Sequence, residues 1–207
     1  MVSQQLRAWD VFDERILAVM DYVPRERFVP PEWRGLAYAD AEIPLGAGKL
    51  LAPPKLQGRA LQALLPEADD NVLEIGAGTG YMTACLALLA RSVTSIELHP
   101  ALAEAARSNL AALDIRNAEV IEGDALAMEL PPEFDVICVN GSLPVAERRL
   151  ARLLRPGGRL FLVTGRPPLM QALRVTRQDD ASWTTEKLFE TCLPPLENAR
   201  QPAEFVF

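Results

Sequence analysis

Residues 72–97 constrain the fold of this chain most, because an apolar run, a glycine-rich turn, a helix and a second strand follow one another there. Residues 72–75 are typical of a strand that is buried on both faces. Three glycines follow at alternate positions: Gly76, Gly78 and Gly80. Glycine adopts positive φ angles and lets a ligand approach the bare backbone. With an apolar helix over residues 81–90 and a strand over residues 92–97, the pattern predicts a βαβ unit with a nucleoside site at its carboxyl edge.

Two acidic residues indicate which nucleoside is bound: Glu74 just before the last apolar residue of the first strand, and Glu97 at the end of the second. A dinucleotide fingerprint would place its third glycine at position 81, where this chain has Tyr81, and an acid beside the turn repels phosphates. S-adenosylmethionine fits instead, because it has a sulfonium, an ammonium group, a ribose diol for Glu97 and no phosphate. A glycine turn that only links strand to helix is the alternative interpretation.

The rest of the chain alternates strands with helices, which predicts a Rossmann-like, doubly wound α/β fold. Further strands are expected over residues 119–124, 134–139 and 159–164, and further helices over residues 56–65, 100–110 and 146–154. Residues 169–176 and 183–192 have strand-like composition around a turn and predict an antiparallel C-terminal hairpin. The expected architecture is a mostly parallel seven-stranded sheet with helices on both faces.

A helical and loop-rich extension over residues 1–55 precedes the predicted nucleoside fold and ends in a candidate substrate loop. Within it, Asp13 is expected to cap a helix that presents Ile16, Leu17 and Met20 on one side. The extension is either a packing cap or one half of a substrate cleft. The whole chain, 1–207, is expected to form a single domain of three parts: the extension over 1–55, a cofactor-binding core over 56–165 and C-terminal antiparallel strands over 166–207.

Polar residues are expected at the carboxyl ends of four parallel strands, which meet along one edge of the sheet. Asp124 is expected to hold the adenine amino group, with the backbone N–H of Ala125 beside it. The predicted cofactor-binding residues are Glu74, Gly76, Ala77, Gly78, Gly80, Glu97, Leu98, Asp124, Ala125 and Asn140. His99, the only histidine, is a general base in one interpretation and a residue at the adenosine rim in the other.

Composition argues against several other functions. The formal net charge of −7 disfavours a nucleic-acid binder, whose surface would carry a basic patch. Three cysteines in apolar surroundings, Cys85, Cys138 and Cys192, are expected to be reduced core thiols, which favours the cytoplasm. We expect no signal peptide, no membrane-spanning segment and no metal site, because the chain has neither a long apolar run nor metal-ligand spacing.

Three N-terminal segments resemble the signature of the protein-L-isoaspartate O-methyltransferase family: residues 23–31 (VPRERFVPP), 36–40 (LAYAD) and 43–46 (IPLG). Four further segments resemble the cofactor core that this family shares with other class I methyltransferases: residues 72–80, 95–97, 123–124 and 154–160. The resemblance implies transfer of a methyl group from S-adenosylmethionine to the α-carboxylate of isoaspartyl residues, the first step in repair of damaged protein.

The predicted substrate loop departs from the family that the chain resembles. Members have Thr-Ile-Ser-x-Pro there, with the serine beside the accepting carboxylate, whereas this chain has Leu50 and Ala52 at the threonine and serine positions. Because a carboxylate needs hydrogen-bond donors to be held for attack, isoaspartyl methylation is expected to be weak or absent, with cofactor binding intact. Ser142 is a candidate for a replacement hydroxyl, with a simple turn residue as the alternative, and no other catalytic residue is assigned.

Three functions remain open from the sequence: an isoaspartyl methyltransferase that tolerates Ala52, a methyltransferase with a different acceptor, and a non-catalytic protein that binds S-adenosylmethionine or S-adenosylhomocysteine. The expected partner is a protein or peptide carboxylate, or an unidentified acceptor, with no nucleic acid and no membrane.

Overall fold

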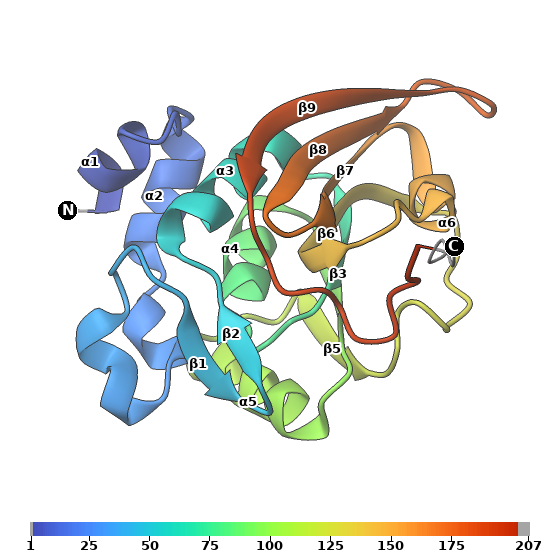
Figure 1. Cartoon of the computed structure of the whole chain (residues 1–207). Coiled ribbons are helices and arrows are strands. Elements are labelled where there is room, and N and C mark those ends of the chain that lie inside the picture. The colour runs from blue at the N-terminus through green and yellow to red at the C-terminus, as the bar shows by residue number, and fades with distance from the viewer. Residues whose placement is uncertain (1, 203–207) are drawn as a thin grey trace, which may run out of the picture.

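A seven-stranded sheet forms the centre of the computed structural model, which describes residues 2–202 (Figure 1). Its strands lie in the order β5-β4-β3-β6-β7-β8-β9. Their bounds are β3 (Asn71–Ile75), β4 (Ser92–Glu97), β5 (Ala118–Glu122), β6 (Phe134–Leu143), β7 (Leu154–Arg166), β8 (Leu169–Arg177) and β9 (Trp183–Thr191). The neighbours from β5 to β7 pair in parallel, and β8 and β9 are added antiparallel. The predicted α/β fold with a mostly parallel sheet and an antiparallel C-terminal hairpin is therefore confirmed.

Helices cover both faces of the sheet because neighbouring strand residues point to opposite sides. Val72 packs into the core beneath most of the helices, whereas Leu73 packs into a second core together with Leu150. The first face carries α1 (Val2–Arg7), α2 (Glu14–Tyr22), α3 (Pro54–Leu64), α4 (Tyr81–Leu89) and α5 (Pro100–Ala112). The second face carries α6 (Arg148–Arg152). Among residues 2–202, no helix is both long and apolar enough to cross a membrane.

The N-terminal extension packs into the same core as the first-face helices. Asp13 caps α2 as predicted, since its side chain accepts hydrogen bonds from the backbone N–H groups of Arg15 and Ile16 at 2.9 and 3.3 Å. Two 3₁₀ helices, η1 (Arg25–Phe28) and η2 (Pro31–Leu36), follow α2. They lead to a hairpin of β1 (Ile43–Gly46) and β2 (Lys49–Leu51) that the sequence did not predict.

The structure corrects three local predictions. The strand predicted over residues 134–139 is longer in the structure: β6 continues through residues 140–142 to Leu143, because the backbone of Ser142 bonds to the segment after β9. The helix predicted over residues 146–154 is limited to α6, since Leu154 already belongs to β7. Cys85 and Cys138 are buried as expected, whereas Cys192 is exposed.

Candidate functional site

The glycine turn after β3 brings bare backbone to the carboxyl edge of the sheet. Gly76 has a φ angle of +87°, and a Cβ atom there would lie 3.2 Å from the carbonyl oxygen of Asn140 on the neighbouring strand β6. A side chain at this position would therefore be strained and would crowd the neighbouring strand. A cavity lies beside the turn, and Gly76, Ala77 and Gly78 are among its lining residues.

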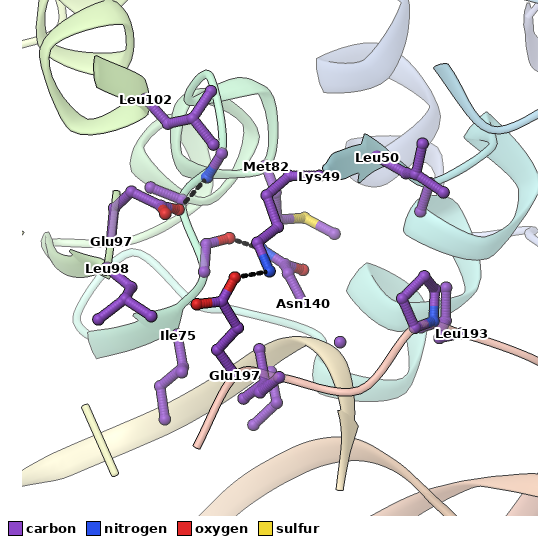
Figure 2. Close-up of a pocket in the computed structure, with 18 of the residues that line it drawn as sticks. Lys49, Leu50, Ile75, Met82, Glu97, Leu98, Leu102, Asn140, Leu193 and Glu197 are labelled. Carbon is purple, nitrogen blue, oxygen red and sulfur yellow. Dashed lines mark hydrogen bonds and ion pairs between the residues drawn. The ribbon is translucent and has the colours of Figure 1, made fainter. Parts of the chain in front are cut away.

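Glu97 ends β4 and is held in a fixed orientation at the cavity. Its Oε2 atom accepts a hydrogen bond from the backbone N–H of Gly78 at 2.8 Å, and its Oε1 atom accepts one from that of His99 at 3.0 Å. Only 5% of the residue is exposed. Figure 2 shows the carboxylate beside the glycine turn, with the Gly78 bond drawn. Each carboxylate oxygen has a further lone pair, so Glu97 can accept two more hydrogen bonds from a ligand.

The cavity brings together eight of the ten residues predicted to bind the cofactor: Gly76, Ala77, Gly78, Glu97, Leu98, Asp124, Ala125 and Asn140. Asp124 follows β5, where its Oδ1 atom accepts a bond from the backbone N–H of Leu126 at 2.8 Å and its Oδ2 atom accepts one from Asn198 Nδ2 at 2.9 Å. The convergence of strand ends expected from the sequence is therefore present, although Asp124 already has an internal partner.

Glu74 and Gly80 do not line this cavity, as far as residues 2–202 show. Glu74 lies inside the ladder of β3, opposite Ser95 of β4, and is completely buried. Its Oε2 atom accepts hydrogen bonds from Thr83 Oγ1 at 2.5 Å and Ser95 Oγ at 2.6 Å, and its Oε1 atom accepts one from Asn140 Nδ2 at 2.7 Å. The expectation that Glu74 faces a cationic ligand directly is not met; it lies behind Asn140, which does line the cavity.

Burial raises the pKa of Glu74 to about 7, because the ionised carboxylate loses its hydration. The hydrogen bonds from Ser95, Thr83 and Asn140 oppose this rise, and the charge of Glu97 adds to it. Asn140 Nδ2 also donates to the carbonyl oxygen of Gly76 at 3.0 Å. The side-chain amide of Asn140 therefore links Glu74 to the backbone of the glycine-rich loop.

The β1–β2 hairpin and the segment after β9 form the other walls of the cavity. Leu50 and Ala52 both line it, so the two positions that lack hydroxyls are at the site. Ser142 is fully buried, and its hydroxyl donates to the carbonyl oxygen of Leu193 at 2.9 Å. Because Ser142 is absent from the cavity lining within the described part of the chain, it does not supply the replacement hydroxyl.

Three residues at or behind this site had no role in the sequence analysis. Lys49 and Glu197 line the cavity and form an ion pair across it, and His99 Nε2 lies 3.0 Å from the same carboxylate oxygen of Glu197 (Figure 2). Arg25 is fully buried behind the hairpin. Lys49 follows the glycines of the hairpin turn, which is a weak sequence signal, and Glu197 has none. No group of three or more metal-ligating side chains occurs in residues 2–202.

A parallel sheet with a glycine turn, a fixed acid at the next strand end and a cavity at its carboxyl edge defines a nucleoside-binding α/β protein. The family model for protein-L-isoaspartate(D-aspartate) O-methyltransferase matches residues 1–201. This chain therefore belongs to the protein-L-isoaspartate O-methyltransferase family.

Curated relatives and solved structures agree with this assignment. The protein-L-isoaspartate O-methyltransferase of Rhodopseudomonas palustris is 38% identical over 201 residues, which cover 96% of this chain and 92% of the relative. That of Aeropyrum pernix is 37% identical over 202 residues, covering 95% and 77%. A Plasmodium falciparum structure assigned to the same family, in complex with S-adenosyl-L-homocysteine, has a TM-score of 0.82 at 19% identity and covers 95% of this chain and 96% of that one. At that identity the structural likeness supports the fold.

Proposed function

We propose that this chain is an S-adenosylmethionine-dependent methyltransferase, with the cofactor bound along the carboxyl edge of β3, β4 and β5. The orientation of Glu97 is the observation that carries the proposal. Its two oxygens are held by backbone donors, and Glu97 lines the cavity together with the glycine turn. A carboxylate fixed in this way fits a vicinal diol, which presents two donors, and it would repel a phosphate.

The other lining residues fit the remaining parts of the cofactor. Asp124 can accept from the adenine amino group once Asn198 moves aside, and the backbone N–H of Ala125 lies next to it in the chain. The glycine turn and Asn140 border the space for the methionine part. The cofactor supplies an electrophilic methyl group on its sulfonium. A carboxylate acceptor is already ionised at pH 7, so the chain needs to position it rather than remove a proton.

Replacing Glu97 by alanine is expected to weaken the binding of S-adenosylmethionine and S-adenosylhomocysteine by about ten- to a hundredfold, because one charged hydrogen-bonding partner contributes about 1.5–3 kcal/mol. Isothermal titration of both ligands measures this change. Glu122→Ala is the matched control: Glu122 is the register partner of Glu97 on β5, is exposed and is not among the cavity residues of the described chain. Unchanged affinity in Glu97→Ala would refute the cofactor assignment.

For the acceptor, we propose that this chain methylates isoaspartyl peptides weakly or not at all. Leu50 and Ala52 leave the wall of the cavity apolar, and Ser142 uses its hydroxyl elsewhere. A carboxylate against this wall finds no hydroxyl donor at Leu50 or Ala52, at a cost of about 1–3 kcal/mol for each polar group left unpaired. The apolar wall also favours two alternatives to isoaspartyl methylation: a methyltransferase with a different acceptor, and a protein that binds the cofactor without catalysis.

The double variant Ala52→Ser with Leu50→Thr is expected to raise isoaspartyl methylation about tenfold or more, because each restored hydroxyl provides one donor. Transfer of labelled methyl from S-adenosylmethionine to an isoaspartyl peptide measures it. A control with the same substitutions at exposed positions, Leu169→Thr with Ala181→Ser, should leave the rate unchanged. Full turnover by the unaltered chain would show that the loop hydroxyls are dispensable. Cofactor binding without transfer in either chain would indicate a different acceptor or a non-catalytic role.

A further inference from the structure

We infer that Lys49 binds the carboxylate of the methyl acceptor and that Glu197 takes the place of that carboxylate in the free protein. The inference rests on the proposed function and deepens it, because it names Lys49 as the residue that selects a carboxylate as the acceptor group.

Lys49 is placed on the wall where the acceptor is expected. It opens β2 and directly precedes Leu50, and both residues line the cavity together with Ala52. Figure 2 shows its side chain reaching over the cavity between Glu97 and Asn140 to meet Glu197. A lysine ammonium has three donors, so it can replace the hydroxyl donors that this wall lacks.

The charges of the cavity leave Lys49 as the natural anchor for an anion. Four carboxylates line the described cavity: Glu42, Glu97, Asp124 and Glu197. Lys49 is the one lysine or arginine among the lining residues of the described chain, and His99 is the other basic side chain there. An anionic acceptor would be repelled by most of this lining, so its carboxylate has one favourable position, at Lys49.

In the free protein, the carboxylate of Glu197 occupies the position beside Lys49 that we assign to the acceptor carboxylate. It accepts from Lys49 Nζ and lies 3.0 Å from His99 Nε2, and the bond from Lys49 holds its pKa below the usual range. The pair is half open to solvent, with 30% of the Lys49 side chain and 46% of the Glu197 side chain exposed. Exposed ion pairs contribute little to stability, so a second carboxylate can displace Glu197.

Glu197 lies on a segment that is attached to the sheet without being part of it. The chain after β9 bonds to β6 through the backbone of Ser142, at Pro194 on one side and Leu196 on the other. Glu197 directly follows this attachment, and Asn198 bonds to Asp124. The same short segment therefore contacts both the proposed adenine position and the proposed acceptor position, which makes its release a common step for both ligands.

The test uses the full chain saturated with S-adenosylhomocysteine, titrated with an isoaspartyl peptide and with the same peptide carrying an amide in place of the isoaspartyl α-carboxylate. The unaltered chain should bind the carboxylate peptide about tenfold more tightly than the amide, and Lys49→Gln should abolish the difference. Glu197→Gln, which removes the competing charge, should tighten carboxylate binding about three- to tenfold. Lys55→Gln is the control, since Lys55 is 28% exposed and pairs with Asp40 at 2.5 Å outside this cavity.

The possible outcomes separate the two proposals. If S-adenosylhomocysteine does not bind, the proposed function fails and the inference fails with it. If S-adenosylhomocysteine binds but Lys49→Gln keeps the preference for carboxylate, the inference alone is wrong. It is also wrong if the amide binds as tightly as the carboxylate, or if neither the unaltered chain nor Glu197→Gln binds the peptide. Such a result would indicate an uncharged or cationic acceptor, which is compatible with the four carboxylates that line the cavity.

Discussion

Arg25→Ala is expected to lower the free energy of unfolding by about 3–5 kcal/mol, because no part of the Arg25 side chain reaches solvent. Its Nε atom donates to the carbonyl oxygen of Ala37 at 2.6 Å, and its two Nη atoms donate to Gln57 Oε1 and to the carbonyl oxygen of Ala52. The guanidinium also lies 4.6 Å from the ring centroid of Tyr81. Each acceptor left without a donor costs about 1–3 kcal/mol.

The buried charge of Arg25 offsets part of this contribution. Burial lowers its pKa, which shows that the charged form loses hydration in this position. Removal of the charge therefore returns some free energy, while the loss of three hydrogen bonds and of the packed side chain outweighs it. Chemical denaturation measures the balance. Arg27→Ala is a matched control on the same 3₁₀ helix, where Arg27 is exposed, and should change stability by less than about 0.5 kcal/mol.

Arg25 also connects the fold to the site. Ala52 and Gln57, two of its partners, line the cavity on the side of the proposed acceptor. Loss of Arg25 should therefore loosen the hairpin wall before the whole chain unfolds. An effect on stability as small as that of the Arg27 variant would contradict this account.

The features that the sequence predicted well are those encoded by neighbouring residues. The glycine turn, the cap at Asp13 and the paired C-terminal strands all depend on local patterns, and the structure contains each of them. The strand end at Glu97 was also predictable, because the acid follows an apolar run directly.

The features that the sequence did not predict depend on contacts between distant segments. β6 continues through Ser142 because residues 194–196 bond to it, and nothing near position 142 indicates this partner. The ion pair of Lys49 with Glu197 joins the second hairpin strand to the chain after β9. Arginine is rarely buried, and no sequence pattern marks Arg25 as an exception; its burial depends on three acceptors from separate segments.

Glu74 shows why one predicted ligand residue lies outside the cavity. The prediction ended the strand at Ile75, as β3 does, but it treated Glu74, one residue before that end, as part of the edge of the sheet. Glu74 therefore sits between two strands, opposite Ser95 on β4 and Cys138 on β6, where it is covered on both sides. A side chain one residue before the end of a central strand can therefore be buried within the sheet, while a side chain just beyond the end lies at the site.

The stability of this protein is expected to fall as the pH rises from about 4.5 to 7, and Glu74→Gln is expected to remove that fall. In the unfolded chain a glutamate loses its proton near pH 4.5, whereas burial raises the pKa of Glu74 to about 7 in the folded chain. Between these values the folded state holds a proton that the unfolded state has released. Stability therefore decreases with pH across this window, by about 1.4 kcal/mol per pH unit and about 3 kcal/mol in total.

Glutamine is neutral at every pH, and its side chain can still accept from Asn140 while its amide donates to the hydroxyls of Thr83 and Ser95. The variant and the unaltered chain should thus be similarly stable at pH 5, and the variant should be about 2–3 kcal/mol more stable at pH 8. Chemical denaturation at pH 5, 6, 7 and 8 measures both slopes, with Glu119→Gln on the exposed side of β5 as the control. Carboxyl groups with lowered pKa, such as Asp13, change protonation below this window and do not obscure it. Parallel slopes for the two proteins would show that Glu74 is ionised in the folded state, held by its three donors strongly enough to outweigh burial.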